Sequence, residues 1–64
     1  MTGAEIIKIL KAHGWLVLRQ SGSHVRLGNG ALRTTVPVHG KADVKAGTLW
    51  SIERQTGLKI RQER

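Results

Sequence analysis

The chain has 64 residues, enough for one domain, and it contains no cysteine, which excludes disulfide bridges and thiolate metal sites. No apolar run approaches the roughly 18 residues that a membrane span requires, and no signal-peptide pattern follows Met1, so we expect residues 1–64 to form one soluble, cytoplasmic domain without a membrane partner. Eleven lysines and arginines against four acids give a net charge of +7, which favours a polyanionic partner, most commonly nucleic acid, with an acidic protein as the alternative.

The first segment, residues 2–13, predicts a helix. Thr2 is a suitable N-cap, and Glu5 follows it at the spacing of a capping box. Gly14 is well placed to end the helix in the left-handed conformation. The apolar stripe at helical spacing consists of Ile6, Ile7 and Leu10.

Three short strands follow this helix. Apolar and β-branched residues predict them over residues 15–20, 24–27 and 32–38. The sequence GNGA at residues 28–31 has the composition of a turn. Because Pro37 cannot donate a hydrogen bond to a ladder, the third strand is expected to end there or to lie at an edge.

The last predicted element is a helix over residues 48–56, preceded by a loop at 39–47 and ended by Gly57. The order helix, three strands, helix predicts an α+β fold in which two helices cover one face of an antiparallel sheet. Alternation then divides the strand residues between the two faces. The residues expected beneath the helices are Val25, Leu27, Leu32 and Val36. The residues expected on the open face are His24, Arg26 and Arg33.

Four segments match a known family in order: GAEIIKILKAHGW at residues 3–15, RQSGSH at 19–24, TVPVHGKADVKAGTL at 35–49 and SIERQTGL at 51–58. On these segments the sequence resembles the HicA toxins of bacterial type II toxin–antitoxin systems. The resemblance implies the fold of a double-stranded RNA-binding domain, with the same element order. It also implies an endoribonuclease that cleaves messenger RNA without a metal or cofactor, stops translation and is blocked by a HicB-type antitoxin. The catalytic residue implied by the resemblance is His24 of the GSH motif.

The chemistry of His24 suits that role. Metal-free RNA cleavage uses the neighbouring 2′-hydroxyl as nucleophile, and imidazole, which titrates near neutral pH, can take its proton. Without the resemblance, a surface histidine in a hairpin is the simpler interpretation. The residues expected to bind RNA are Arg19, Gln20, Gly22, Ser23, Arg26, Arg33 and Lys45. Each also has a structural explanation, since arginines are common on solvated faces and Gly-Ser is ordinary turn chemistry.

The identity of a general acid is left open by the sequence. His13 and His39 are both candidates, although His13 also suits the C-terminal end of a helix as a cation. With a single histidine, water or Arg26 has to assist the leaving group. A metal site is not expected, because the three histidines and Asp43 lack the spacing of metal ligands.

Two further features concern binding. Lys45 and the start of the second helix at Thr48 are expected to attract phosphate, by analogy with double-stranded RNA-binding domains. Trp15 is expected in the core, whereas Trp50 lies one position off the apolar stripe of its helix, and we interpret it as an antitoxin contact rather than a base-stacking residue. The residues expected to contact the antitoxin are His24, Arg26 and Trp50.

Two other functions compete with the nuclease interpretation. The same basic sheet face would serve a non-catalytic RNA-binding domain, which binds RNA without cutting it. A domain that only recognises an acidic protein would instead lose its RNA affinity near physiological salt, because counterion release alone would drive binding.

Overall fold

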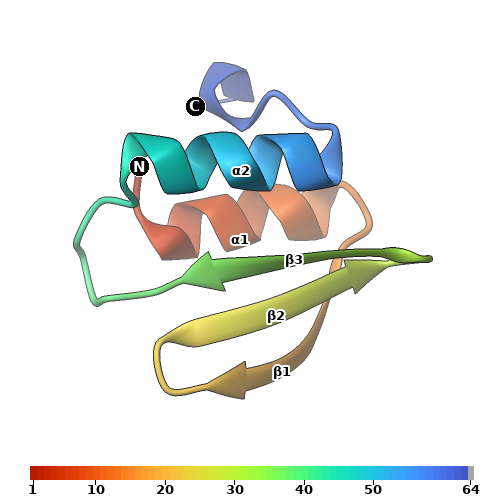
Figure 1. Cartoon of the computed structure of the whole chain (residues 1–64), viewed down its shortest axis with the longest axis horizontal. Helices are drawn as coiled ribbons and strands as arrows, with labels where there is room; N and C mark the ends of the chain where they lie inside the picture. The colour runs from red at the N-terminus through yellow and green to blue at the C-terminus, as the bar shows by residue number, and fades with distance from the viewer. Residues whose placement is uncertain (64) are drawn as a thin grey trace.

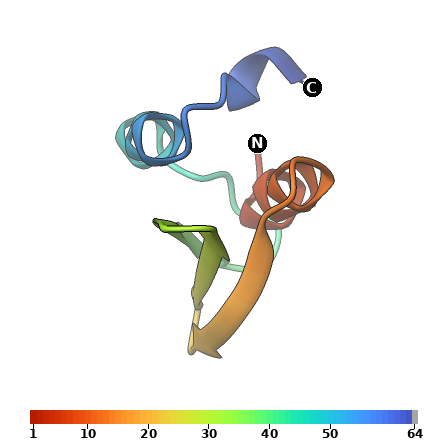
Figure 2. The same cartoon turned by 90° about the vertical axis from the view of Figure 1, so that its right-hand side faces the viewer.

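The computed structural model describes residues 1–63, and its elements follow the predicted order. These elements are helix α1 (Gly3–Ala12), strands β1 (Leu16–Ser21), β2 (His24–Asn29) and β3 (Leu32–Pro37), helix α2 (Ala46–Thr56) and the 3-10 turn η1 (Ile60–Glu63). Both helices lie on one side of an antiparallel sheet of order β1-β2-β3 (Figure 1, Figure 2). The α+β prediction is therefore confirmed. No helix within residues 1–63 is long and apolar enough to cross a bilayer.

Helix α1 begins with the predicted capping box. The Thr2 hydroxyl accepts a hydrogen bond from the Glu5 amide (3.2 Å), and the Glu5 carboxylate accepts one from the Thr2 amide (2.8 Å). These bonds satisfy backbone donors that a helix start otherwise leaves unpaired. The helix buries Ile6 and Leu10, and it ends before Gly14, whose φ of +89° is left-handed as predicted.

The strand residues divide between two faces as predicted, with one exception. Val25, Leu27 and Val36 are buried beneath the helices. Leu32, which was expected beside them, is 50% exposed. It opens β3 next to the β2–β3 turn, and this turn extends past the ends of both helices (Figure 1). The prediction for Leu32 was wrong because alternation gives the face of a residue but not the reach of the helices above it.

The sheet extends beyond the cover of the helices at β1. All six residues of this strand are exposed, and Leu16 keeps 68% of its surface in solvent. The ladder to β2 is interrupted by a bulge between Val17 and Arg19. Strand β2 continues two residues further than predicted, through Asn29, so the turn before β3 is shorter than the GNGA sequence suggested.

Helix α2 begins at Ala46, two residues before the predicted start. Threonine is a common N-cap residue, but Thr48 lies within the first turn of the helix. The N-cap is Lys45, whose side chain makes no capping hydrogen bond. The helix ends as predicted at Gly57, whose φ is +75° and whose amide donates to the Glu53 carbonyl (2.8 Å).

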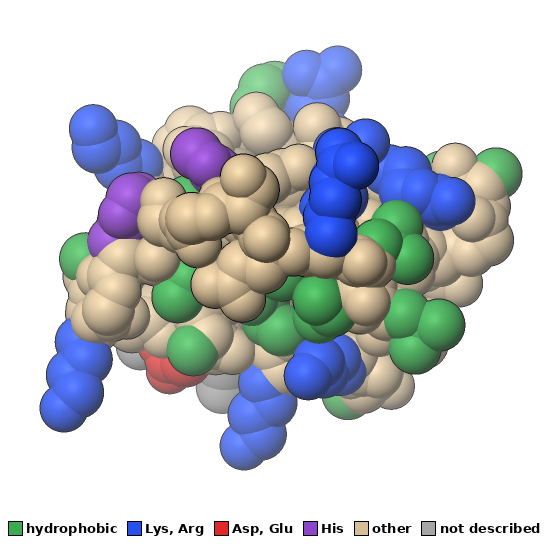
Figure 3. Space-filling model, turned by 90° about the horizontal axis from the view of Figure 1, so that it is seen from below, with side chains coloured by type: hydrophobic (Ala, Val, Ile, Leu, Met, Phe, Trp, Pro, Cys, Tyr) green, Lys and Arg blue, Asp and Glu red, His purple; other side chains and the backbone are tan. Residues whose placement is uncertain are grey.

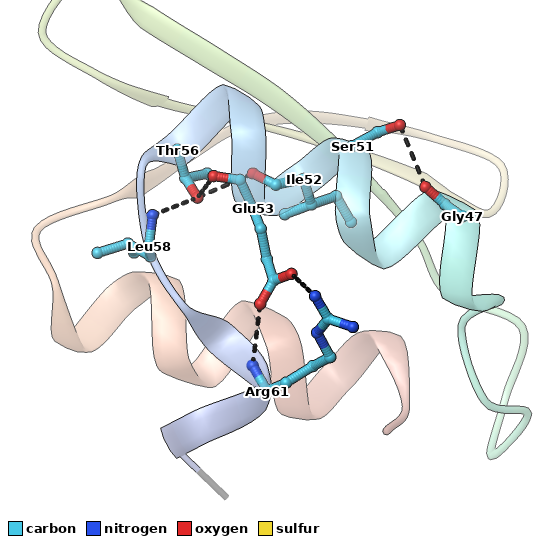
Figure 4. Close-up of polar contacts among 7 residues, drawn as sticks. All are labelled: Gly47, Ser51, Ile52, Glu53, Thr56, Leu58 and Arg61. Atoms are coloured by element: carbon cyan, nitrogen blue, oxygen red, sulfur yellow. Dashed lines mark hydrogen bonds and ion pairs between the residues drawn. The ribbon is translucent and has the colours of Figure 1, made fainter.

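The core includes one residue from the segment that follows α2. Ile60, the first residue of η1, is fully buried, and η1 contacts α1. The Glu53 carboxylate of α2 holds this turn, because it accepts a hydrogen bond from the Arg61 amide (3.2 Å) and pairs with the Arg61 guanidinium (2.9 Å) (Figure 4). The buried hydrophobic residues are Ile6, Leu10, Trp15, Val25, Leu27, Val36, Leu49, Ile52 and Ile60.

Candidate functional site

The β1–β2 turn fixes the backbone position of His24. Gly22 adopts a φ of +57°, a conformation that favours glycine, and the side-chain amide of Gln20 donates a hydrogen bond to the Gly22 carbonyl (3.1 Å). The Ser23 carbonyl accepts a hydrogen bond from the Val38 amide (2.6 Å), which ties the turn to the end of β3. His24 then opens β2 with an exposed side chain on the face opposite buried Val25.

The loop after β3 brings a second histidine to the same place. His24 pairs with Pro37 across the β2–β3 ladder, and His39 follows Pro37 by two residues. Both histidines line one groove of about 560 Å³ between the end of the sheet and the start of α2. The groove is lined by His24, Thr35, Pro37, His39, Ala42, Asp43, Val44, Lys45 and Thr48. It therefore combines two imidazoles with a lysine beside a helix N-terminus.

A pair of arginines lies next to this groove on the open face of the sheet. Arg19 and Arg26 face each other across the β1–β2 ladder. Arg26 is half-buried, and its guanidinium donates to the hydroxyl of Thr35 (3.0 Å), which lines the groove. Like charges directly opposite on a sheet repel each other, so an anion bound between these arginines would relieve the repulsion.

Histidine side chains lie near one another at one end of the side away from the helices (Figure 3). Hydrophobic side chains lie toward the other end of this view, among lysines and arginines. Counted over both faces of the sheet, the exposed large hydrophobic residues are Leu16, Val17, Leu18 and Leu32. This side of the molecule thus offers basic and apolar groups to a partner.

Comparison with protein families covers the elements that form this site. The family model described as the HicA toxin of bacterial toxin-antitoxin matches residues 3–58. The chain belongs to the HicA toxin family. This HicA toxin is accordingly one component of a toxin–antitoxin system, and its partner is the antitoxin. No curated protein matches the chain in sequence.

Several predicted site residues of the HicA toxin come together in the structure. His24 and Lys45 share the groove, and Arg26 and Arg19 lie beside it. Gly22 and Ser23 form the turn that leads into His24, and Gln20 bonds to that turn. Within residues 1–63, no cluster of three His, Cys, Asp or Glu side chains is arranged to hold a metal ion.

Two predicted residues of the HicA toxin lie apart from the groove. Arg33 precedes Pro37 by four residues, which separates it from His24 by about 13 Å along the strand. Its guanidinium donates to the carbonyls of Gly30 and Leu32 (both 2.7 Å), so it braces the β2–β3 turn.

Trp50 is also separate from His24 and Arg26. It is 52% exposed, the Arg54 guanidinium lies 4.8 Å from its ring centroid, and it lines a different hollow with Leu58. Trp50 and His24, both expected to contact the antitoxin, therefore line different hollows.

From the sequence, His39 was only one of two candidates for a general acid. His13, the other candidate, caps the C-terminus of α1 and lines a third hollow with Lys8. The strand register could have singled out His39. A short turn after Asn29 pairs His24 with Pro37, and His39 follows Pro37 by two residues.

Proposed function

We propose that this HicA toxin is a metal-independent endoribonuclease that cleaves messenger RNA and so blocks translation. The observation that carries this proposal is the position of His24, exposed at a groove that also holds Lys45 and adjoins the Arg19–Arg26 pair. A general base has to reach its substrate, and a polyanionic substrate needs cations around that base. We assign its action to the cytoplasm, where messenger RNA is translated.

In the proposed reaction, His24 acts as the general base. Its imidazole takes the proton of a 2′-hydroxyl, and the 2′-oxygen attacks the adjacent phosphorus. The bond from phosphorus to the 5′-oxygen breaks, which leaves a 2′,3′-cyclic phosphate on one product, and the leaving 5′-oxygen takes a proton from water or a neighbouring acid to become a 5′-hydroxyl. Arg26 and Arg19 stabilise the extra negative charge on phosphorus, since arginine suits phosphate oxygens in geometry and charge.

We also propose that the antitoxin is of the HicB type and inhibits by covering the groove. An acidic surface fits the net charge of +7, and contact with His24 and Arg26 would exclude RNA from the base. Trp50, on another side of the toxin, serves as a separate anchor for the same partner, because an exposed indole is a common hot-spot residue.

The test is cleavage of a long single-stranded messenger RNA in excess EDTA by the wild type, His24→Ala and His13→Ala. His13→Ala is the matched control, since this histidine lies outside the groove. We expect His24→Ala to lose about 10²–10⁴-fold in rate, the usual contribution of a general base, and His13→Ala to keep wild-type activity.

Other outcomes would contradict the proposal. If the wild type binds RNA without cutting it, the protein is a non-catalytic RNA-binding domain. Equal cutting by the wild type and His24→Ala would remove His24 from the reaction. Activity that disappears in EDTA would show that the cleavage depends on a metal. Thermal melts of the variants identify any loss that comes from unfolding.

A further inference from the structure

The groove holds two imidazoles, and the proposed function uses only one of them. His24 begins β2, and His39 lies in the loop two residues after β3, the strand that pairs with β2. Both side chains are exposed, and both line the 560 Å³ groove. A phosphodiester bound in this groove therefore has one imidazole available from the start of β2 and one from the loop after β3.

The backbone holds both histidines in place. The Val38 amide, one residue before His39, donates to the Ser23 carbonyl (2.6 Å), one residue before His24. The His39 carbonyl accepts from the Ala42 amide (3.0 Å), which closes a turn after β3. Because these contacts are made by the backbone, a change of either imidazole leaves them intact.

We propose that His39 is a second catalytic residue, the general acid for the leaving group; this inference rests on the proposed ribonuclease function. Protonated His39 donates its proton to the 5′-oxygen as the bond from phosphorus to that oxygen breaks. His24 has by then gained the proton of the 2′-hydroxyl, so the reaction transfers one proton to each side of the phosphate and needs no further reactant. Exchange with water restores both imidazoles.

The other ionisable groups of the groove suit this role less well. The Asp43 carboxylate accepts a hydrogen bond from the ammonium of Met1 (2.9 Å), so it is already engaged in an ion pair. Lys45 precedes α2, and an ammonium holds its proton more tightly than an imidazolium near neutral pH. Imidazole is the side chain whose ordinary titration range allows both gain and loss of a proton there.

The experiment compares two leaving groups. First, a cleavage site is mapped in a messenger RNA with the wild type. A short DNA oligonucleotide of that sequence is then made with a single ribonucleotide at the site, once with the natural bridging 5′-oxygen and once with sulfur in its place. A thiolate leaves without protonation, because thiols are far more acidic than alcohols. The enzymes are the wild type, His39→Gln, His24→Gln and the control His13→Gln.

We expect His39→Gln to cut the oxygen substrate about 10²–10⁴-fold more slowly than the wild type and to cut the sulfur substrate at nearly the wild-type rate. His24→Gln should be slow on both substrates, because the 2′-hydroxyl still needs a base. His13→Gln should match the wild type on both.

Two results would overturn the role of His39 alone. Wild-type rates of His39→Gln on the oxygen substrate would mean that no acid is lost. An equal defect on both substrates would mean that His39 only supports the groove. A wild type that cuts neither the messenger RNA nor the oligonucleotides would instead refute the ribonuclease function, and with it this inference.

Discussion

The burial of Ile60 gives a quantitative prediction about stability. Its side chain is fully buried in the core, in a turn that contacts α1. Removal of one methylene by Ile60→Val should cost about 0.5–1.5 kcal/mol, and Ile60→Ala should cost about 2–5 kcal/mol, because the cavity collapses only in part. A domain of this size is stable by roughly 5 kcal/mol at the low end of the usual range, so Ile60→Ala leaves little stability.

Urea unfolding followed by circular dichroism measures the loss of unfolding free energy in both variants, and thermal unfolding measures the shift in Tm. At about 4–8 °C per kcal/mol for a domain of this length, Ile60→Val should lower Tm by about 2–12 °C. Lys59→Ala is the matched control, since Lys59 is exposed beside Ile60 and should change stability by less than about 0.5 kcal/mol. If Ile60→Ala costs no more than Lys59→Ala, the turn does not belong to the core and the argument is refuted.

Two further predictions concern charge. Hydrogen bonds from Arg61, first from its amide and then from its guanidinium, lower the pKa of Glu53 in the folded state below its ordinary value of 4.5. The stabilisation is thus complete above pH 4.5 and is lost as pH falls through the folded pKa. Free energies of unfolding of the wild type and Glu53→Gln, measured with urea, should therefore differ by about 0.2–1 kcal/mol at pH 7 and converge in acid; a constant difference would contradict this. For RNA binding measured in the His24→Ala background, Arg19→Gln should reduce the slope of log K against log salt by about 0.7, one phosphate contact, whereas Arg54→Gln on α2 should not.

Local signals in the sequence were sufficient for most of the fold. The capping box of Thr2 and Glu5 and the left-handed Gly57 act within a few residues, so composition alone identifies them. Whether Leu32 and Ile60 are exposed or buried depends on which distant element packs over each residue. The exposed Leu32 lies beyond the helices, and Ile60 is buried because α1 and α2 leave room for η1. The periodicity of apolar residues shows neither how far the helices extend over the sheet nor where η1 packs.

In the candidate site, too, local features could be predicted from the sequence, whereas contacts between distant segments could not. The turn leading into His24 could be predicted because Gly22 and Ser23 are adjacent to it in sequence. The position of His39 next to His24 depends on the register of β2 against β3. The predicted turn at residues 28–31 ended β2 two residues too early, so it did not give this register. Trp50 was correctly expected to be exposed, but only the three-dimensional arrangement shows that it belongs to a different side of the toxin from Arg26.

The contact between η1 and α1 also has a consequence for synthesis on the ribosome. The first helix of the domain is packed by one of its last residues, Ile60, so a nascent chain that has only reached the end of β3 lacks both α2 and the residue that closes the core. The complete core, with Ile60 buried in it, therefore cannot form before residue 60 has been added to the chain. If the toxin cleaves messenger RNA as proposed, its own message meets a toxin with a complete core only after the codon of residue 60 has been read.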